Sequence, residues 1–336
     1  MRLPFGPTLV NRTISSVAGN LRTSWDLVRR VSPQVTAGDL VLLCRPLSRT
    51  RVAYGLWLRL LRATGRPVTV VYVVHNEPEP LFRGQVRFLR RSARGHRLRF
   101  VAHSPAIAAV VAPYLGFKPD VIALPFKAPD FVESAPLNNR PVRLAFLGMG
   151  HRSKGLDLVL QALELSAALV GENRLQFAIQ CYLPFRDAPS ERLHRDIKAL
   201  AGKLAGVEVI ARELSPSEYL QQVTQADIVL VPNRLDTYKF AISGVFADAM
   251  GAGRPVIVAD GSYVSELVRE SGAGVLFEDG NGLSLQHAIV EAAGRIEELL
   301  ERAKAARLRW VQEQGPAAFV TRVLQLQESP LASLSG

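Results

Sequence analysis

Short apolar runs alternate with amphipathic stretches along the chain, and this alternation predicts strands separated by helices. In the N-terminal half, strands are predicted over residues 39–44, 68–74, 98–102 and 120–124. Helices are predicted between them over residues 52–63 and 105–115, with a basic helical stretch before residue 98. Strands that alternate with helices favour a parallel sheet, whose ligands bind beyond the carboxyl ends of the strands.

The C-terminal half repeats this alternation with clearer punctuation. An apolar run over residues 142–147 precedes a glycine-rich turn and a periodic helix over residues 156–165. Another run over residues 227–231 is broken by Pro232 and Asn233. The next predicted elements are a helix over residues 243–250, a strand over residues 255–259 and a helical region over residues 283–314.

Composition divides this pattern into two domains. The chain has 336 residues, of which 48% are hydrophobic and 21% charged, which suits two globular domains with their own cores. Pro129, Pro136 and the pair Asn138 and Asn139 have the composition of a linker. We predict an α/β protein with Rossmann-like domains over residues 1–128 and 141–320, a linker over residues 129–140 and a tail over residues 321–336.

The helix that begins at Ser243 is a candidate anion site. The first amides of a helix have no internal partner, and the helix dipole favours negative charge there. Ser243, Gly244 and Val245 would present these amides. Asp248 lies about one turn further on, so its carboxylate can accept hydrogen bonds from a ribose diol beside a diphosphate.

A second candidate anion site follows the run at residues 142–147. The turn that begins at Gly148 contains Arg152 and Lys154 and ends at Gly155. Glycine permits close backbone approach and the two cations attract an anion, although the spacing matches neither the Walker pattern nor the dinucleotide fingerprint. The turn alone is a weak signal.

Together the two segments resemble the C-terminal domain of family 4 (group 1) glycosyltransferases. Phe146-Leu-Gly148 with Lys154-Gly155 looks like the strand-Gly-x5-Lys-Gly loop of that family. The stretch from Asp248 to Ile257 looks like its Glu-Ala-Met-Ala-x-Gly-x-Pro-Val-Val segment. The resemblance implies the GT-B architecture, in which two Rossmann-like domains with parallel sheets face each other across a cleft.

The resemblance also implies roles for individual residues. Lys154 would contact the distal phosphate of a sugar nucleotide, the amides of residues 243–245 would hold the diphosphate, and Asp248 would replace the ribose-binding Glu. The implied catalytic residues are His75, Arg152 and Lys154. The implied donor-binding residues are Gly148, Pro232, Asn233, Tyr238, Ser243, Gly244, Val245 and Asp248.

Three positions depart from the family pattern. Met149 stands where the family usually has an Arg, and Arg152 is the candidate substitute. Phe240 stands where the family has the first Glu of its Glu-x7-Glu pair, which leaves Tyr238, Lys239 and Ser243 as nearby polar groups. At position 248 an Asp replaces the second Glu and is shorter by one methylene.

Histidines follow two of the N-terminal strands. His75 comes directly after residues 68–74 and looks like the family histidine that faces the donor sugar. His103 follows residues 98–102 and is the weaker candidate, since a histidine at a strand end also serves as an ordinary loop cap. Glu77 is a candidate acceptor-site base or contact, and an exposed loop carboxylate is the alternative.

Charge is concentrated in the N-terminal half. Residues 1–139 contain 20 Lys and Arg against 7 Asp and Glu, whereas residues 140–336 contain 21 against 23. Arginines alternate with apolar residues over residues 82–100, a composition that suits an anionic bilayer surface or acceptor. An ordinary solvated face and nucleic-acid binding are the alternatives. The predicted acceptor or membrane face consists of Glu77, Arg83, Arg87, Arg90, Arg91 and Arg94.

The few cysteines and the lack of an apparent signal peptide or membrane span guide the predictions of cofactor and location. Cys44 and Cys181 are the only cysteines, which predicts neither a disulfide framework nor a metal cluster. No signal peptide or membrane span is expected, so the predicted location is the cytoplasm, with peripheral contact at the inner face of the cell membrane.

The resemblance completes the functional prediction. It implies retaining, metal-independent transfer from a nucleotide sugar to a lipid-linked or saccharide acceptor, and nucleic acid is not an expected partner. A catalytically silent subunit or scaffold of polysaccharide assembly and a nucleotide-sugar epimerase are the alternative functions.

Overall fold

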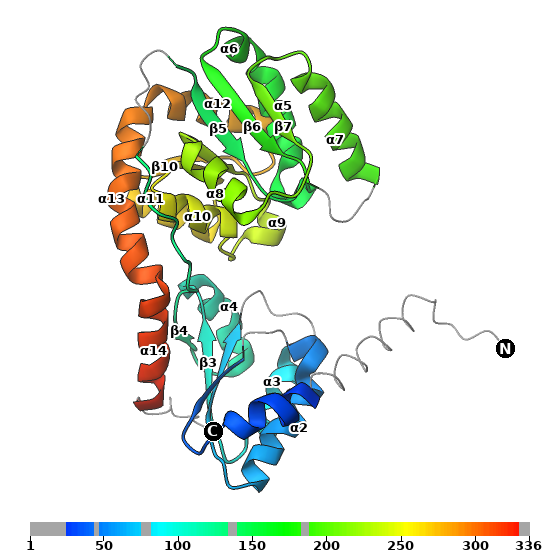
Figure 1. Cartoon of the computed structure of the whole chain (residues 1–336), viewed down its shortest axis with the longest axis vertical. Helices are drawn as coiled ribbons and strands as arrows, with labels where there is room; N and C mark the ends of the chain where they lie inside the picture. Colours follow the sequence, from blue (N-terminus) through cyan, green and yellow to red (C-terminus); the bar gives the residue numbers. More distant parts are fainter. Residues whose placement is uncertain (1–24, 44–46, 75–81, 134–139, 183–187, 329–336) are drawn as a thin grey trace, which may run out of the picture. The chain divides into compact units, whose positions relative to one another are not determined.

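The computed structural model describes residues 25–43, 47–74, 82–133, 140–182 and 188–328, without the side chains of residues 47–51. The chain forms two compact units (Figure 1). The N-terminal unit comprises Met1–Leu124 with Phe319–Gly336, and the C-terminal unit comprises Pro125–Ala318. Each unit contains one sheet of parallel strands, which confirms the predicted α/β class.

The N-terminal sheet has the order β1-β2-β3-β4. Its strands are β1 (Leu40–Leu43), β2 (Thr69–Val74), β3 (Arg97–Ala102) and β4 (Asp120–Val121). The connecting helices are α2 (Leu47–Ala63), α3 (Phe82–Ser92) and α4 (Pro105–Leu115), and η1 (Leu27–Val31) and η2 (Ser32–Gln34) precede β1. Because β2 is buried along its whole length, its uninterrupted apolar run marks the centre of the sheet.

The C-terminal end of the chain belongs to this N-terminal unit. Helix α14 (Pro316–Glu328) packs Val323 and Leu326 against Val71 and Val101 of the sheet. Arg97 donates a hydrogen bond of 2.5 Å to the carbonyl of Gln327. Residues 321–328 are therefore a packed helix rather than part of the predicted tail, because their apolar side chains cover one face of the sheet.

The C-terminal sheet has the order β10-β9-β8-β5-β6-β7. Its strands are β5 (Val142–Phe146), β6 (Leu175–Gln180), β7 (Val207–Ile210), β8 (Ile228–Val231), β9 (Val256–Ala259) and β10 (Gly274–Phe277). Its helices are α5 (Leu156–Leu165), α6 (Ala167–Gly171), α7 (Ala188–Ala201), α8 (Pro216–Gln225), α9 (Leu235–Tyr238), α10 (Gly244–Ala252), α11 (Tyr263–Ser271), α12 (Gly282–Gly294) and α13 (Ile296–Gln314).

Two apolar cores cover the two faces of this sheet. One core packs α5 and α12 against side chains such as Leu144 and Ile257, and the other packs α10 and α13 against Ala145 and Val258. The chain order reverses between β5 and β8, which are hydrogen-bonded neighbours. In open parallel sheets the crevice at such a reversal is the usual ligand site. The loops after β5 and β8 are therefore the expected location of a ligand site.

Residues before β5 are already part of the C-terminal unit. Phe126 donates its amide to the carbonyl of Gln314 and stacks on the ring of Trp310. Arg254 donates a hydrogen bond of 2.6 Å to the carbonyl of Val132. The described part of the predicted linker, residues 129–133, thus packs on this unit, and the unit begins at Pro125 rather than at residue 141.

An ion pair with a buried carboxylate ties the starts of β5 and β8 together. Both nitrogens Nη1 and Nη2 of Arg140 donate to the carboxylate of Asp227, at 2.6 and 2.7 Å. The amide of Arg143 adds a third hydrogen bond of 2.8 Å to the same carboxylate. Asp227 is only 1% exposed, so this pairing compensates the desolvation of its charge.

Candidate active site

The glycine loop after β5 is held tightly against the loop after β8. Gly155 has a φ of +78°, and a Cβ at this position would lie 2.0 Å from the carbonyl oxygen of Pro232. Gly148 has a φ of +107°, and its amide donates a hydrogen bond of 2.8 Å to Oε1 of Gln180. Both glycines are therefore required by backbone conformation, and at Gly155 also by close approach.

This packing places two predicted site residues together. Lys154 ends the short helix η3 (Arg152–Lys154), and Tyr238 ends α9 in the loop after β8. The ammonium group of Lys154 lies 4.1 Å from the centroid of the Tyr238 ring, within the range of a cation–π contact. The tyrosine thus orients the lysine without neutralising its charge.

The start of α10 is the second part of the site. Ser243 occupies the N-cap position but makes no side-chain cap hydrogen bond. Its hydroxyl is buried, and within the described residues it has no hydrogen-bond partner. A Cβ at Gly148 would lie 3.8 Å from Cγ2 of Val245, so the glycine loop faces the first turn of this helix. The two candidate anion sites therefore converge.

Asp248 lies in the second turn of α10 and is tied to α8. The hydroxyl of Tyr219 donates a hydrogen bond of 2.8 Å to its Oδ2. Burial raises the pKa of Asp248, and the Tyr219 hydrogen bond opposes that shift. No ion pair found among the described residues includes Asp248. Its carboxylate is thus positioned by a tyrosine and is not used as half of a salt bridge.

Arg152, which was predicted to be catalytic, lies near an ion pair that anchors the loop after β8. Arg152 lies 3.7 Å from Asp157, and its side chain is 75% exposed. Asp157 is paired more closely with Arg234, which comes directly after the buried residues Pro232 and Asn233. Arg152 is therefore loosely held at the rim of the loop, whereas Arg234 anchors the loop after β8 to α5.

The structure also shows the surroundings of Met149 and Phe240, two positions that depart from the family pattern. Met149 is 44% exposed at the start of the glycine loop. Phe240 lies after α9, and the ammonium group of Lys239 is 5.4 Å from its ring centroid. The side chain of Phe240 has no hydrogen-bond acceptor for a sugar hydroxyl. The side chain of Met149 has only its weakly accepting thioether.

The predicted N-terminal candidates have different outcomes. His75 and Glu77 lie outside the described residues. His103 is buried at the end of β3, beside Ser104, which caps α4 through a hydrogen bond to the amide of Ile107. The basic helical stretch ends as a helix at Ser92, and Arg99 is buried on β3.

Arg90 does not belong to an open basic face. Its Nη2 donates a hydrogen bond of 2.5 Å to the carbonyl of Leu115, and its guanidinium lies 5.6 Å from the ring centroid of Phe117. Positively charged side chains satisfy the last carbonyls of a helix, so Arg90 caps the end of α4. Arg83, Arg87, Arg91 and Arg94 are exposed, and their role as a binding face stays a prediction.

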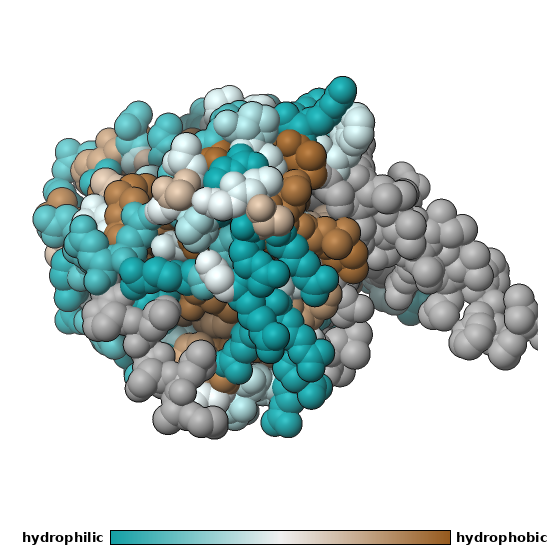
Figure 2. All heavy atoms as spheres, turned by 90° about the horizontal axis from the view of Figure 1, so that it is seen from below, coloured by the Kyte–Doolittle hydropathy of each residue, from teal (hydrophilic) through white to brown (hydrophobic). Residues whose placement is uncertain are grey.

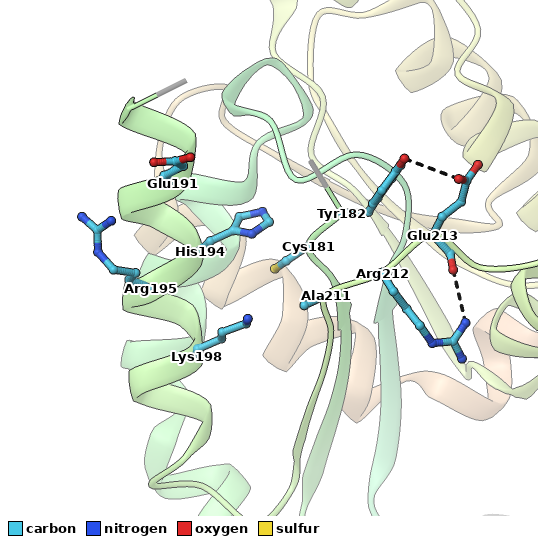
Figure 3. A pocket seen from close by; sticks show the side chains of 9 residues that line it. All are labelled: Cys181, Tyr182, Glu191, His194, Arg195, Lys198, Ala211, Arg212 and Glu213. Atoms are coloured by element: carbon cyan, nitrogen blue, oxygen red, sulfur yellow. Dashed lines mark hydrogen bonds between the residues drawn. The ribbon is translucent and has the colours of Figure 1, made fainter. Parts of the chain in front are cut away.

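A cavity of about 640 Å³ lies between the glycine loop and α7 (Figure 3). Glu191, His194 and Lys198 line it from one face of α7, opposite the residues that follow β6 and β7. A Cβ at Gly150 would lie 2.5 Å from Nε2 of His194, so the cavity and the loop share a wall.

Chemically this cavity is not a nucleophile site. Burial raises the pKa of the Cys181 thiol to about 12, so the thiolate is scarce at neutral pH. Burial and the nearby Lys198 lower the pKa of His194. The cavity therefore presents neutral hydrogen-bonding groups and a few charged side chains beside the loop.

The described part of the chain contains neither a cluster of metal ligands nor a membrane-spanning helix. No group of three or more His, Cys, Asp and Glu side chains there could hold a metal ion. No helix there is both long enough and apolar enough to cross a membrane.

The comparisons with known proteins agree with this architecture. Two Rossmann-like units with parallel sheets are the fold of solved GT-B glycosyltransferase structures. Residues 141–295 match the family described as glycosyl transferases group 1. This match covers most of the C-terminal unit, which is therefore similar to a group 1 glycosyltransferase domain.

Several solved structures share this fold. Anabaena HepE in complex with UDP aligns with a TM-score of 0.65 and 16% identity, over 87% of this chain and 79% of that one. An α,α-trehalose-phosphate synthase (UDP-forming) from Burkholderia vietnamiensis aligns with a TM-score of 0.65 and 13% identity, over 93% and 76%. A glycosyltransferase from Rickettsia africae aligns with a TM-score of 0.60 and 11% identity, over 87% and 98%. No curated protein matches the sequence.

Proposed function

We propose that this protein transfers a glycosyl group from a nucleotide sugar to a hydroxyl of a lipid-linked or saccharide acceptor, with retention of configuration and without a metal. The observation that carries the proposal is the convergence of Gly148, Lys154 and the start of α10 at the reversal of the sheet. Phosphate binding at a helix start beside a glycine turn and a lysine is a recurrent arrangement.

The diphosphate would be held by α10 and the glycine loop. The first amides of α10 and the unpartnered hydroxyl of Ser243 supply hydrogen-bond donors to an anion. Lys154 supplies a full positive charge from the facing loop. Both are fixed before the donor arrives, and preorganised charge at a developing anion is expected to be the main catalytic contribution.

The ribose would bind Asp248. Because Oδ2 accepts the Tyr219 hydroxyl, Oδ1 is left for the diol of the sugar. A buried ionised carboxylate gains from such hydrogen bonds, since burial has removed the water that would otherwise solvate it. The nucleoside would therefore lie over α10 with its base toward α8.

The departing diphosphate would be neutralised by protein groups. Lys154, Arg152 and the helix amides would carry this charge in place of a metal, and the phosphate itself would take the acceptor proton. By the resemblance, His75 would face the donor sugar. Retention then requires no dedicated protein base.

The donor is proposed to be a UDP sugar. HepE was solved with UDP and with UDP-glucose, and the Burkholderia synthase is named as UDP-forming. The acceptor is proposed to be lipid-linked, in a pathway of polysaccharide assembly. The protein would then work from the cytoplasm, as a peripheral protein at the inner face of the cell membrane.

One observation favours a second candidate, a catalytically silent subunit of the same fold. Phe240 and Met149 remove two side chains that the family uses on the donor, and Lys239 lies over the ring of Phe240. Such a protein would bind a nucleotide without transferring or hydrolysing the sugar. Release of free UDP from a UDP sugar by the purified protein would exclude it.

A thermal-shift screen tests the donor site. The protein is heated with UDP, GDP, ADP, TDP and their common sugars, in parallel with Lys154→Ala and Asp248→Ala. A ligand at one hundred times its Kd stabilises the folded state by about 2.7 kcal/mol, which is readily measured. We expect a shift with UDP compounds that Asp248→Ala abolishes, that Lys154→Ala reduces only in part and that EDTA leaves unchanged. Absence of a shift with every nucleotide would contradict the proposal.

A further inference from the structure

Helix α2 has two adjacent apolar rows, of which only one is buried. Its inner row, Ala53, Trp57 and Leu61, is buried in the N-terminal unit. Its outer row has the same spacing and consists of Val52, Leu56 and Leu60, which are 44%, 55% and 37% exposed. Residues four apart share a helix face, so the outer row forms a continuous apolar ridge. Packing within the unit explains only the inner row.

A row of arginines lies along the neighbouring helix α3 and in the turn that follows it. Arg83, Arg87, Arg91 and Arg94 are spaced four, four and three residues apart and are exposed, opposite the buried Phe82, Val86 and Leu89 of α3. The two helices are in direct contact, because a Cβ at Gly55 would lie 2.6 Å from the Phe88 ring. Arg62 also donates a hydrogen bond to the carbonyl of Arg94.

Helices α2 and α3 lie on the same face of the sheet. Helix α2 connects β1 to β2 and α3 connects β2 to β3, and these neighbouring strands are parallel. Right-handed crossovers in the same direction place both helices on one face of the sheet (Figure 1), and the ridge and the arginine row lie on solvent-exposed sides of these helices. On the face that Figure 2 displays, hydrophobic residues reach the surface among strongly hydrophilic ones.

Positive charge predominates strongly in this region. Residues 40–119 contain 14 Lys and Arg, and their only carboxylates are Glu77 and Glu79. Within α2 and α3 there is no acidic side chain at all. Exposed arginines therefore have no carboxylates on their own helices to pair with, and they retain their charge for an external anion.

We propose that the outer side of α2 and α3 docks on an anionic lipid bilayer, with Val52, Leu56 and Leu60 entering the interface and the arginine row contacting lipid phosphates. This inference rests on the proposed function in that a lipid-linked acceptor places the enzyme at a membrane. An apolar ridge beside a cationic row is the composition of helices that lie in the bilayer interface. A soluble anion or a nucleic acid would use the arginines but give no role to the ridge.

Vesicle co-sedimentation of the full chain tests this, with phosphatidylcholine vesicles and with vesicles that also contain phosphatidylglycerol. One variant removes the ridge, Leu56→Ser with Leu60→Ser. Its matched control is Leu308→Ser, an exposed leucine on α13. A second variant removes charge, Arg87→Gln with Arg91→Gln, and its control is Arg309→Gln with Arg322→Gln on α13 and α14.

The wild-type protein is expected to bind only the vesicles that contain phosphatidylglycerol. The charge variant should lose about 30-fold in partitioning, which corresponds to about 1 kcal/mol for each cation. The ridge variant should lose about tenfold or more, and its remaining binding should vanish at high salt, where the wild-type protein retains some. Both controls should bind like the wild-type protein.

Two outcomes would overturn the proposal. Equal binding of the ridge variant and the wild-type protein would show that lipid does not contact the ridge. A concentration-dependent dimer that the ridge variant abolishes, without vesicle binding, would assign the ridge to a second copy of the chain. No donor or acceptor is present in this measurement, so failed glycosyl transfer does not affect it. An unchanged nucleotide thermal shift in the ridge variant would show that the donor site remains intact.

Discussion

The hydroxyl of Tyr219 donates a hydrogen bond of 2.8 Å to Oδ2 of Asp248, which joins the first turn of α8 to the second turn of α10. Asp is one methylene shorter than the Glu that the family usually has here. A tyrosine that fixes one carboxylate oxygen leaves the other oriented toward a ligand. Tyr219 is therefore a positioning residue for the proposed ribose subsite.

Tyr219→Phe is expected to weaken UDP binding about two- to tenfold, because the hydrogen bond that orients Asp248 contributes about 0.5–1.5 kcal/mol. Calorimetric titration measures this. In an Asp248→Ala background the same substitution should have no effect on affinity, since the group that it positions is gone. Equal losses in both backgrounds would mean that Tyr219 acts only through the packing of α8.

Asp248→Asn should bind nucleotide more weakly yet unfold at a higher temperature at neutral pH. Burial raises the pKa of Asp248, so the folded state favours the protonated carboxyl. The stability from this shift is complete below the unfolded pKa and is lost as the pH rises through the folded pKa. The Tm advantage of Asn should therefore fade as the pH falls to about 4. Thermal unfolding against pH measures it, and a lower Tm for the variant at pH 7 would contradict this account.

Lys154→Gln is expected to reduce kcat about 100-fold or more while changing the KM for the donor much less. Charge aimed at a leaving phosphate acts mainly in the transition state, and loss of one such donor typically has this effect. Steady-state kinetics with a UDP sugar measures both constants. Tyr238→Leu should reduce kcat only about two- to fivefold, because the cation–π contact contributes about 0.5–1 kcal/mol. A similar change in KM and none in kcat would assign Lys154 to ground-state binding alone.

Gly155→Ala is expected to lower the stability of the C-terminal unit by more than about 2 kcal/mol, because an alanine there is strained and its Cβ would meet the carbonyl of Pro232. Gly171→Ala is the matched control in the same unit. Gly171 lies at the end of α6, and a Cβ there would meet nothing within 4 Å. Chemical denaturation should find the control close to the wild-type protein, and a Gly155→Ala protein of wild-type stability would contradict the tight packing of the loop.

Asp227→Ala should destabilise the same unit by about 3–5 kcal/mol, because it leaves the guanidinium of Arg140 and the amide of Arg143 without their acceptor. Asp260→Ala removes the carboxylate that pairs with Arg269 on the surface, and it should change the stability by less than about 1 kcal/mol. The comparison separates a buried ion pair from an exposed one. Equal effects of the two substitutions would contradict the burial of Asp227.

Much of the secondary structure could be predicted, because its signals are local. The strand β2 is a largely apolar run that is followed in the sequence by polar residues, and the predicted residues 68–74 differ from Thr69–Val74 by one residue. Gly148 and Gly155 mark the turn that they form, since few other residues tolerate its positive φ angles. The parallel sheets follow from the alternation of such strands with helices.

Other features could not be predicted, because their signals are distant in the sequence. Residues 321–328 have little local pattern to distinguish them from a tail, and they are helical against a sheet whose strands lie some 200 residues earlier. Arg90 belongs to the same run of arginines as Arg87 and Arg91, but only its contact with Leu115 separates it from the exposed row.

Local patterns in the sequence were enough to predict the α/β class, the two Rossmann-like halves and the pair of candidate phosphate-binding turns, because helix starts and glycine turns are properties of a few adjacent residues. Which side chains meet became clear from the tertiary structure. It brought Lys154 to Tyr238 and Tyr219 to Asp248, and it left one apolar row of α2 uncovered. Such pairings depend on how helices pack across a sheet, and the packing is a sum over the whole unit that no short segment encodes.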